Sequence, residues 1–370
     1  MAPTLRLITL TPDDAPASLD DPAAALLHGV ARVDAAAQLA SRGHGDAADP
    51  VAQRLGQLRH ADYVRTSAVV AVLAPDDVVG YAWLRAMQTS NTDAVELEVC
   101  VHPDHRRRGV GAALWDAAVA VVRDQGRHVV QAYSDVVTEP PPGPGALVPP
   151  TGSGRVPADD DATRFALARG FALEQLERMS RLDLPVDPGL LRRFAEAAGE
   201  HADDQYLTQT WFHDVPESAL ADIAALESRM MTDAPSGGLE LEADPWDAAR
   251  LRTWLDRFTE RGQSVLLTAA VHVPTGRIVG YTALIVPTEP DDARPVADQD
   301  TTIVDPEHRG HRLGMAVKVA NLEALAARRP DVRRVVTWNA EENGPMLDIN
   351  VALGFRPDGG FAAWQLRLPD

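Results

Sequence analysis

Hydrophobic and polar positions alternate with two periods along the 370-residue chain. Runs rich in β-branched residues at 66–74 and 78–87, separated by "PDD", predict a β-hairpin, and 94–101 predicts another strand. Apolar residues at helical spacing predict helices over 23–40, 50–60 and 109–126. We expect the first strand at 5–11. After the helix at 109–126, we expect a strand at 128–137, a short helix at 159–170 and a last strand at 171–184. This order predicts an α+β fold: a mostly antiparallel sheet with one strand–helix–strand crossover.

The same order of elements occurs twice. "DPEHRGHRLGMAV" (305–317) repeats "HPDHRRRGVGAAL" (102–114), "IVGYTAL" (278–284) repeats "VVGYAWL" (78–84), and "NVALGF" (350–355) repeats "ALARGF" (166–171). Three repeats in one order indicate two copies of one domain. We expect a first domain over 1–185 with a Pro/Gly-rich irregular insertion at 138–157, a helical linker over 186–203, and a second domain over 204–370.

Composition narrows the class of protein. The chain has 54 acidic and 35 basic side chains, a net charge of −19, which argues against a nucleic-acid partner. The acidic balance favours a small cationic partner or serves solubility alone. No apolar run reaches the roughly 20 residues of a membrane span, and the first residues do not resemble a signal peptide. The single cysteine, Cys100, allows no intrachain disulfide and fits a reducing compartment, so a cytoplasmic protein is expected. We expect a monomer or a homodimer.

The stretch "VHPDHRRRGVGAAL" concentrates three arginines and two glycines where a strand leads into a helix. The first N–H groups of a helix lack internal partners, and the helix dipole favours an anion there. Glycine lets a phosphate approach the backbone, and arginine holds phosphate oxygens in pairs. The corner suits a pyrophosphate; the alternative is a helix start with glycine for close packing. Neither the Rossmann glycine pattern nor the P-loop is present.

The spacing Arg106-x-x-Gly109-x-Gly111 resembles the acetyl-CoA pyrophosphate loop of the GCN5-related N-acetyltransferase (GNAT) family. The order of elements in each copy resembles the fold of that family, so nearly the whole chain resembles a tandem pair. The resemblance implies a mixed, mostly antiparallel sheet with flanking helices in each domain. It also implies acetyl-CoA as cofactor.

The resemblance assigns cofactor-binding positions in both copies. In copy 1 these are Cys100, Val101, Arg106, Arg107, Arg108, Gly109, Val110 and Gly111; in copy 2 they are Val304, Arg309, Gly310, His311, Arg312, Leu313, Gly314, Asn339 and Asn343. Arg312 stands where copy 1 has Gly109, and it would either crowd the pyrophosphate or clamp it. We expect copy 1 to be the better site because its loop is complete, with the reverse assignment left open.

The implied chemistry needs a base for the acceptor amine. Glu98 and Glu96 share one strand face with Cys100 and are the candidate catalytic residues. Copy 2 offers Asp300 and Asp305, and any of these carboxylates could instead be a solubilising charge. The family position of the tyrosine that often protonates the departing thiolate holds alanine in copy 1 and Asn350 in copy 2.

Other candidates carry less chemistry. Tyr81 and Tyr281 are expected to pack in the core, and Lys318, the only lysine, is expected to aid phosphate binding. Cys100 is not expected to be a nucleophile. The histidines of the two corners lack metal-ligand spacing, so no metal is expected.

The prediction is an acetyl-CoA-dependent N-acetyltransferase that acts on the primary amine of a small molecule by direct attack. The alternative is a catalytically silent acyl-CoA-binding or regulatory protein of the same tandem architecture.

Overall fold

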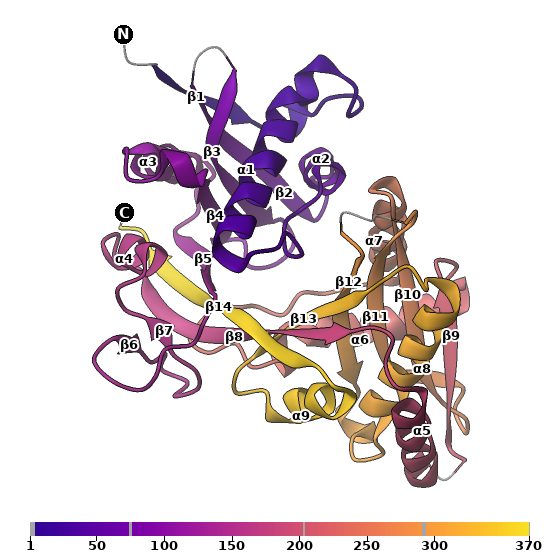
Figure 1. Ribbon diagram of the computed structural model, residues 1–370. Coiled ribbons are helices and arrows are strands. Elements are labelled where there is room, and N and C mark those ends of the chain that lie inside the picture. Colours follow the sequence, from indigo (N-terminus) through magenta and orange to yellow (C-terminus); the bar gives the residue numbers. More distant parts are fainter. Residues whose placement is uncertain (1–3, 74–75, 203, 291–293, 370) are drawn as a thin grey trace. The chain divides into compact units, whose positions relative to one another are not determined.

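The computed structural model describes residues 4–73, 76–202, 204–290 and 294–369 (Figure 1). The expected domain limits at residues 1, 203 and 370 and the proline of the hairpin turn lie outside the described residues. The chain divides into two compact units. Unit 1 comprises residues 1–176, 237–240 and 361–370, and unit 2 comprises residues 177–236 and 241–360.

Unit 1 follows the predicted order of elements. It contains β1 (Leu5–Leu10), α1 (Ala25–Arg42), α2 (Val51–Arg59), β2 (Val64–Leu73), β3 (Asp77–Met87), β4 (Ala94–Val101), α3 (Val110–Asp124), β5 (Val129–Val136) and α4 (Asp161–Leu167). Strands β1 to β4 pair antiparallel, and α3 crosses over so that β5 pairs parallel to β4. The insertion expected to be irregular contains a two-stranded sheet of β6 (Ala146–Leu147) and β7 (Val156–Pro157).

Unit 2 repeats this order, as the sequence repeats predict. It contains α5 (Pro188–Ala202), β9 (Tyr206–Phe212), α6 (Glu217–Asp233), α7 (Ala248–Glu260), β10 (Gln263–His272), β11 (Arg277–Pro287), β12 (Val296–Val304), α8 (Leu313–Arg328), β13 (Arg334–Ala340) and α9 (Gly344–Leu353). Here β9 to β12 pair antiparallel, and β13 pairs parallel to β12. The predicted α+β class, with a mostly antiparallel sheet and flanking helices in each copy, is confirmed.

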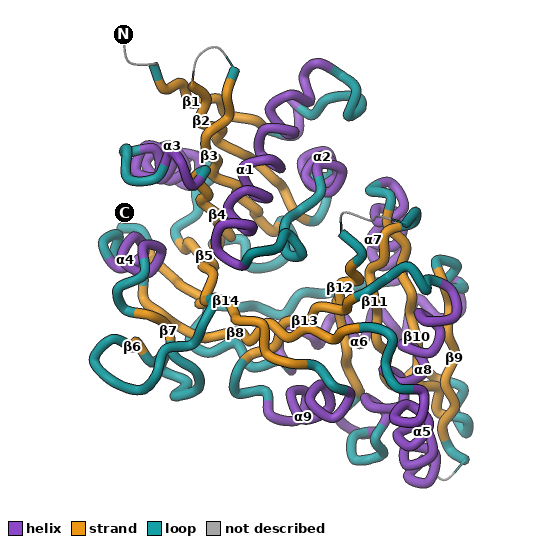
Figure 2. Tube along the Cα trace, viewed as in Figure 1, coloured by secondary structure: helices purple, strands orange, loops and turns teal. Residues whose placement is uncertain are grey.

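The sheet of each unit has helices on both faces (Figure 2). In unit 1, alternate residues of β2 enter different cores: Val70 packs with Leu27 of α1 and Leu58 of α2, whereas Val69 packs with Leu114 of α3. Strand alternation produces this division. In unit 2, α6 and α7 share one core, and α8 shares another with α5. The strands are apolar on both faces because both faces are covered.

The last strands of the two copies are exchanged between the units. Strand β14 (Arg356–Arg367) lies beside β5, and its Trp364 is buried in the core of unit 1 and donates its indole N–H to the Ser134 hydroxyl at 2.9 Å. Strand β8 (Ala172–Asp183) pairs antiparallel with β13 of unit 2, from Glu177 opposite Ala340 to Asp183 opposite Arg334. Each unit is therefore completed by a strand from the opposite half of the sequence.

Candidate functional site

Two strand-to-helix corners repeat the same backbone path. Corner 1 (residues 102–110) joins β4 to α3, and corner 2 (residues 305–313) joins β12 to α8. In corner 1 the left-handed positions are Arg107 (φ 61°) and Gly109 (φ 84°), and in corner 2 they are Gly310 (φ 87°) and Arg312 (φ 55°). Arg107 of corner 1 is thus equivalent to Gly310 of corner 2, and Gly109 is equivalent to Arg312, so arginine and glycine exchange places between the two corners. Arg312 keeps the loop path at a cost of about 1–2 kcal/mol.

The first arginine of each corner makes the same contact. Arg106 Nε donates to the carbonyl oxygen of Val101, and Arg309 Nε donates to that of Val304, both at 3.1 Å. Arg309 also pairs with Asp233 at 2.8 Å. The side chains of Arg108 and Arg312 are exposed. Both corners therefore present guanidinium groups beside a helix N-terminus.

The two glycines of corner 1 have different roles. A Cβ atom on Gly109 would meet nothing within 4 Å, so this backbone is open to a ligand. A Cβ on Gly111 would lie 3.2 Å from the Phe165 ring of α4, and one on Gly314 would lie 3.2 Å from Ile349 of α9. The second glycine lets two helices pack closely, which was the alternative explanation of the motif.

Corner 1 has the features of an anion site. The backbone at Gly109 is open, α3 begins at the next residue, and the exposed arginines Arg106, Arg107 and Arg108 precede it, with Arg107 paired to Asp161 at 3.3 Å. Cys100 and Val101 end the strand before this corner, and Val304 does so before corner 2. Val110 and Leu313 begin the following helices and are buried, and the His311 ring lies 5.2 Å from that of Tyr206.

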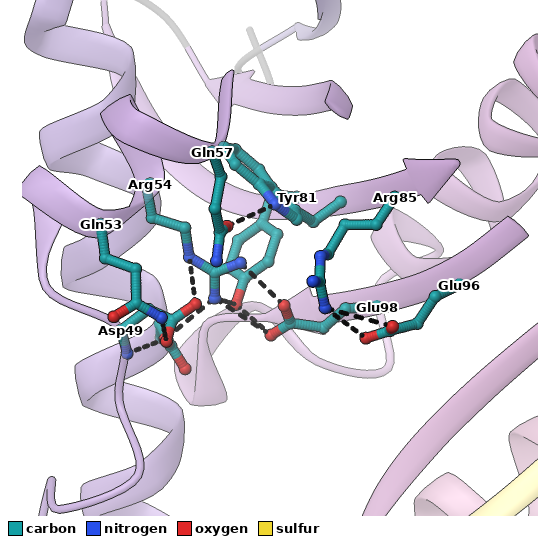
Figure 3. A network of polar contacts seen from close by, with 10 residues as sticks. Asp49, Gln53, Arg54, Gln57, Tyr81, Arg85, Glu96 and Glu98 are labelled. Atoms are coloured by element: carbon teal, nitrogen blue, oxygen red, sulfur yellow. Dashed lines mark hydrogen bonds and ion pairs between the residues drawn. The ribbon is translucent and has the colours of Figure 1, made fainter. Parts of the chain in front are cut away.

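The two predicted catalytic carboxylates of copy 1 are both paired with arginine (Figure 3). Glu98 accepts from Arg54 Nη1 at 3.0 Å and from the Tyr81 hydroxyl. Glu96 accepts from Arg85 Nη1 at 3.2 Å. Tyr81, expected only to pack, is buried and also donates a hydrogen bond; burial and the charge of Glu98 raise its pKa well above the ordinary value.

Arg54 is the centre of this network. Its buried guanidinium also contacts Asp34 of α1 at 3.1 Å and Asp49 at 3.3 Å. Burial and the charge of Glu98 raise the pKa of Asp34, and the same two causes raise the pKa of the Cys100 thiol. A thiolate at Cys100 is thereby disfavoured. In unit 1 the carboxylate of Glu98 accepts hydrogen bonds from both Arg54 and Tyr81, so its oxygens already have partners.

Unit 2 differs from unit 1 by a bulge in the matching strand. Leu284 of β11 pairs with Gln299 of β12, but the preceding Ala283 pairs with Thr301, so Asp300 is an extra residue. In unit 1 the register of β3 with β4 is continuous. Bulges release backbone groups from the ladder and are frequent next to active sites.

Thr301 beside the bulge contacts a carboxylate that the sequence did not suggest. Its hydroxyl donates to Glu227 of α6 at 3.1 Å and lies 3.1 Å from the carboxylate of Asp300. Burial and the Asp300 charge raise the pKa of Glu227 to about 8. In the described part of the chain no arginine is hydrogen-bonded to Glu227. Asp305, the other carboxylate considered in copy 2, caps the turn after β12 by accepting from the Glu307 N–H at 3.1 Å.

Lys318 lies in a buried polar chain, not at the phosphate corner as expected. Its Nζ donates to Gln299 Oε1 at 3.2 Å and to Asn350 Oδ1 at 3.0 Å, and Asn350 Nδ2 donates to Asn339 Oδ1 at 2.8 Å. Burial lowers the pKa of Lys318 to about 7. Asn343 lies outside this chain and caps α9, accepting from the Met346 N–H at 3.4 Å.

Among the residues that the structure describes, no group of three or more His, Cys, Asp and Glu side chains is arranged to hold a metal ion. None of the described helices is both long enough and apolar enough to cross a membrane.

Comparisons with known proteins point to one family. The sequence profile of the acetyltransferase (GNAT) family matches residues 36–139. Mycothiol acetyltransferase of Salinispora tropica is 27% identical over 341 residues, which cover 91% of this chain and 93% of the relative. Glucosamine 6-phosphate N-acetyltransferase of Trypanosoma brucei brucei is 31% identical over 144 residues, covering 37% of this chain and 93% of the relative. A solved tandem GNAT protein from the clavulanic acid biosynthesis pathway superposes with a TM-score of 0.71 at 26% identity, with 99% of both chains covered.

The fold and the two corners, together with these relatives, define the class: the chain belongs to the acetyltransferase (GNAT) family, with the fold present twice in tandem. It is an N-acetyltransferase, and its cofactor is acetyl-CoA.

Proposed function

We propose that this N-acetyltransferase transfers the acetyl group to the primary amine of a small molecule by direct attack, and that unit 2 performs the transfer. The observation that carries the choice of unit is Glu227, a carboxylate with a pKa of about 8 beside the bulge at Asp300. A general base works best when its pKa lies near the working pH, and such shifts cluster at functional sites.

Both units are proposed to hold the cofactor at their corners. Arg106, Arg107, Arg108, Gly109, Val110 and Gly111 would form one pyrophosphate site, and Arg309, Gly310, His311, Arg312, Leu313 and Gly314 the other. Backbone groups of Cys100, Val101 and Val304 would bind the arm of the cofactor, and Asn339 and Asn343 complete the set in unit 2. Bound acetyl-CoA supplies the acetyl group as a thioester, whose carbonyl carbon is open to attack by an amine.

Glu227 is the proposed base in place of Glu98 and Glu96. It would accept a proton from the acceptor amine, and the Thr301 hydroxyl would orient its carboxylate. Glu98 and Glu96 are bound to Arg54 and Arg85, which favours a structural role for both. Unit 1 would then bind acetyl-CoA without transferring its acetyl group, so the alternative of a catalytically silent protein would apply to unit 1 only.

The small-molecule acceptor is supported by the relatives. Two of them are named for mycothiol and for glucosamine 6-phosphate. The net charge of −19 would raise the local concentration of a cationic amine. We therefore propose a small, positively charged primary amine as the acceptor, with an amino sugar as the first compound class to test.

The test is release of free thiol from acetyl-CoA with a panel of amino sugars, polyamines and amino-acid amides. Glu227→Gln should lower kcat by about 10²–10⁴-fold, the usual contribution of a general base. Glu98→Gln is the matched control in unit 1 and should retain kcat within a few-fold. Loss of kcat in Glu98→Gln alone would move catalysis to unit 1, and the absence of thiol release with every amine would contradict small-molecule transfer.

A further inference from the structure

The buried polar chain of unit 2 crosses the gap between two parallel strands. Pairing of β12 with β13 ends at Gln299 opposite Thr337, although β12 continues to Val304 and β13 to Ala340. The chain Gln299–Lys318–Asn350–Asn339 joins the two strands where their pairing ends. A lysine buried at this point requires a reason, because burial of an ammonium without a charged partner is unfavourable.

Lys318 and Glu227 lie on either side of the bulge. Gln299, which accepts from Lys318 of α8, immediately precedes Asp300, and Thr301, which donates to Glu227 of α6, immediately follows it. Helices α6 and α8 belong to different cores of unit 2. The bulge thus separates a lysine whose pKa is lowered to about 7 from a carboxylate whose pKa is raised to about 8. Both groups can therefore gain and lose a proton near neutral pH, as acid–base chemistry requires.

The matching positions of unit 1, all among the described residues, do not form an equivalent chain. Trp115 occupies the position of Lys318, four residues after the second glycine of its corner, and it packs edge-to-face on Phe171 at 5.5 Å. Ala166 stands where unit 2 has Asn350, and Tyr133, two residues after the last β4–β5 pair, stands where unit 2 has Asn339. The lysine is therefore not required by the fold of the unit.

We propose that Lys318 is the acid of the reaction in unit 2 and donates the proton that the coenzyme A sulfur needs when it leaves. The inference rests on the proposed function, since it takes unit 2 as the transferring unit. As the nitrogen–carbon bond forms, Glu227 takes one proton from the neutral amine. As the carbon–sulfur bond breaks, its electron pair stays on sulfur, and Lys318 donates one N–H proton to it. Water then returns a proton to Lys318 and accepts one from Glu227.

The surroundings of Lys318 suit this role. Two of its three N–H groups are used by Gln299 and Asn350, so in the described structure one remains for the sulfur. The Phe355 ring lies 5.5 Å from Nζ. None of these groups titrates, and no carboxylate of β10, β11, β12 or α5 contributes to the pKa shift, whose one cause is burial. The departing thiolate would be the counter-charge that the site lacks.

The first test uses Lys318 as the only lysine of the chain. Protein containing lysine labelled with ¹⁵N at Nζ gives one side-chain signal, which is titrated by NMR in the free protein, with coenzyme A and with desulfo-coenzyme A. We expect coenzyme A to raise the pKa of Lys318 by about one unit or more, because the thiolate favours the ammonium. Desulfo-coenzyme A, which lacks the sulfur, should leave the pKa of Lys318 unchanged. Equal shifts with both ligands, or no shift with bound coenzyme A, would overturn the proposal.

The second test compares variants by the ultraviolet absorbance of the coenzyme A thiolate. Thiolate should form on the native protein at a pH about one unit lower than on Lys318→Met. Lys318→Arg should retain this thiolate because it keeps the charge, yet lower kcat because arginine does not release its proton. Arg328→Met, which removes an exposed cation from the same helix, is the control and should match the native protein. Identical thiolate titration in Lys318→Met would contradict a role beside sulfur.

The two proposals fail in different ways. Calorimetry with coenzyme A on the native protein and on Arg312→Glu shows whether corner 2 binds the cofactor. If the variant binds as many molecules of coenzyme A as the native protein does, unit 2 is not a cofactor site and the proposed function fails. If one of the two sites is lost in the variant but the Lys318 signal of the native protein does not respond to sulfur, the role of Lys318 alone is overturned.

Discussion

At the scale of single residues, Glu227 should affect the free energy of unfolding as well as catalysis. Its pKa rises from 4.5 to about 8 on folding, so the folded chain holds a proton that the unfolded chain has released between these values. The free energy of unfolding therefore falls as pH rises from about 4.5 to 8. Glu227→Gln should remove this dependence and should be more stable than the native protein at pH 8 by about 1–3 kcal/mol, after allowance for partial exposure.

Urea denaturation at pH 5 and pH 8 measures the effect of Glu227→Gln. The advantage of the variant should be much smaller at pH 5, where the folded native protein holds the proton and the unfolded chain still holds it about a quarter of the time. Glu323→Gln, an exposed carboxylate on α8, is the control and should follow the native pH profile. A Glu227→Gln variant that loses stability at pH 8 would show that the carboxylate is ionised and paired in the folded protein.

At the scale of elements, the corners depend on close packing of two helices. A methyl group on Gly111 would lie 3.2 Å from Phe165, so Gly111→Val should force α3 from α4 and destabilise unit 1 by about 1–3 kcal/mol. Phe165→Leu should recover part of this loss in the double variant, because the two sites share one contact. Gly145→Ala has open space around the added Cβ and serves as control. Denaturant midpoints give the comparison, and additive effects in the double variant would argue against the contact.

The elements also show what the sequence could and could not predict. Strand β4 was predicted at its observed limits, and α3 to within two residues, since period-2 and helical patterns are strong there and Gly126 follows the helix. The bulge at Asp300 has no glycine or proline to mark it, and it depends on pairing with β11. Glu227 is one polar residue on an amphipathic helix, and only the folded sheet brings it to Thr301. Lys318 is the only lysine of the sequence, but its burial depends on hydrogen-bond partners from two other elements, β12 and α9.

At the scale of the whole molecule, the exchanged strands tie the end of the chain to its first half. Sequence patterns could not assign β8 and β14 to units, because both are amphipathic strands that follow a helix ending near a glycine. Trp364→Ala should remove a buried indole and its bond to Ser134 and destabilise unit 1 by about 3–5 kcal/mol. Hydrogen exchange should show faster exchange in β4 and β5 of unit 1, more than 200 residues earlier in sequence, with a smaller change in β10 and β11 of unit 2. Leu207→Ala, at an exposed position of β9, should leave both regions protected. Faster exchange confined to unit 2 in Trp364→Ala would contradict the exchange, because the C-terminal strand would then belong to the copy that encodes it.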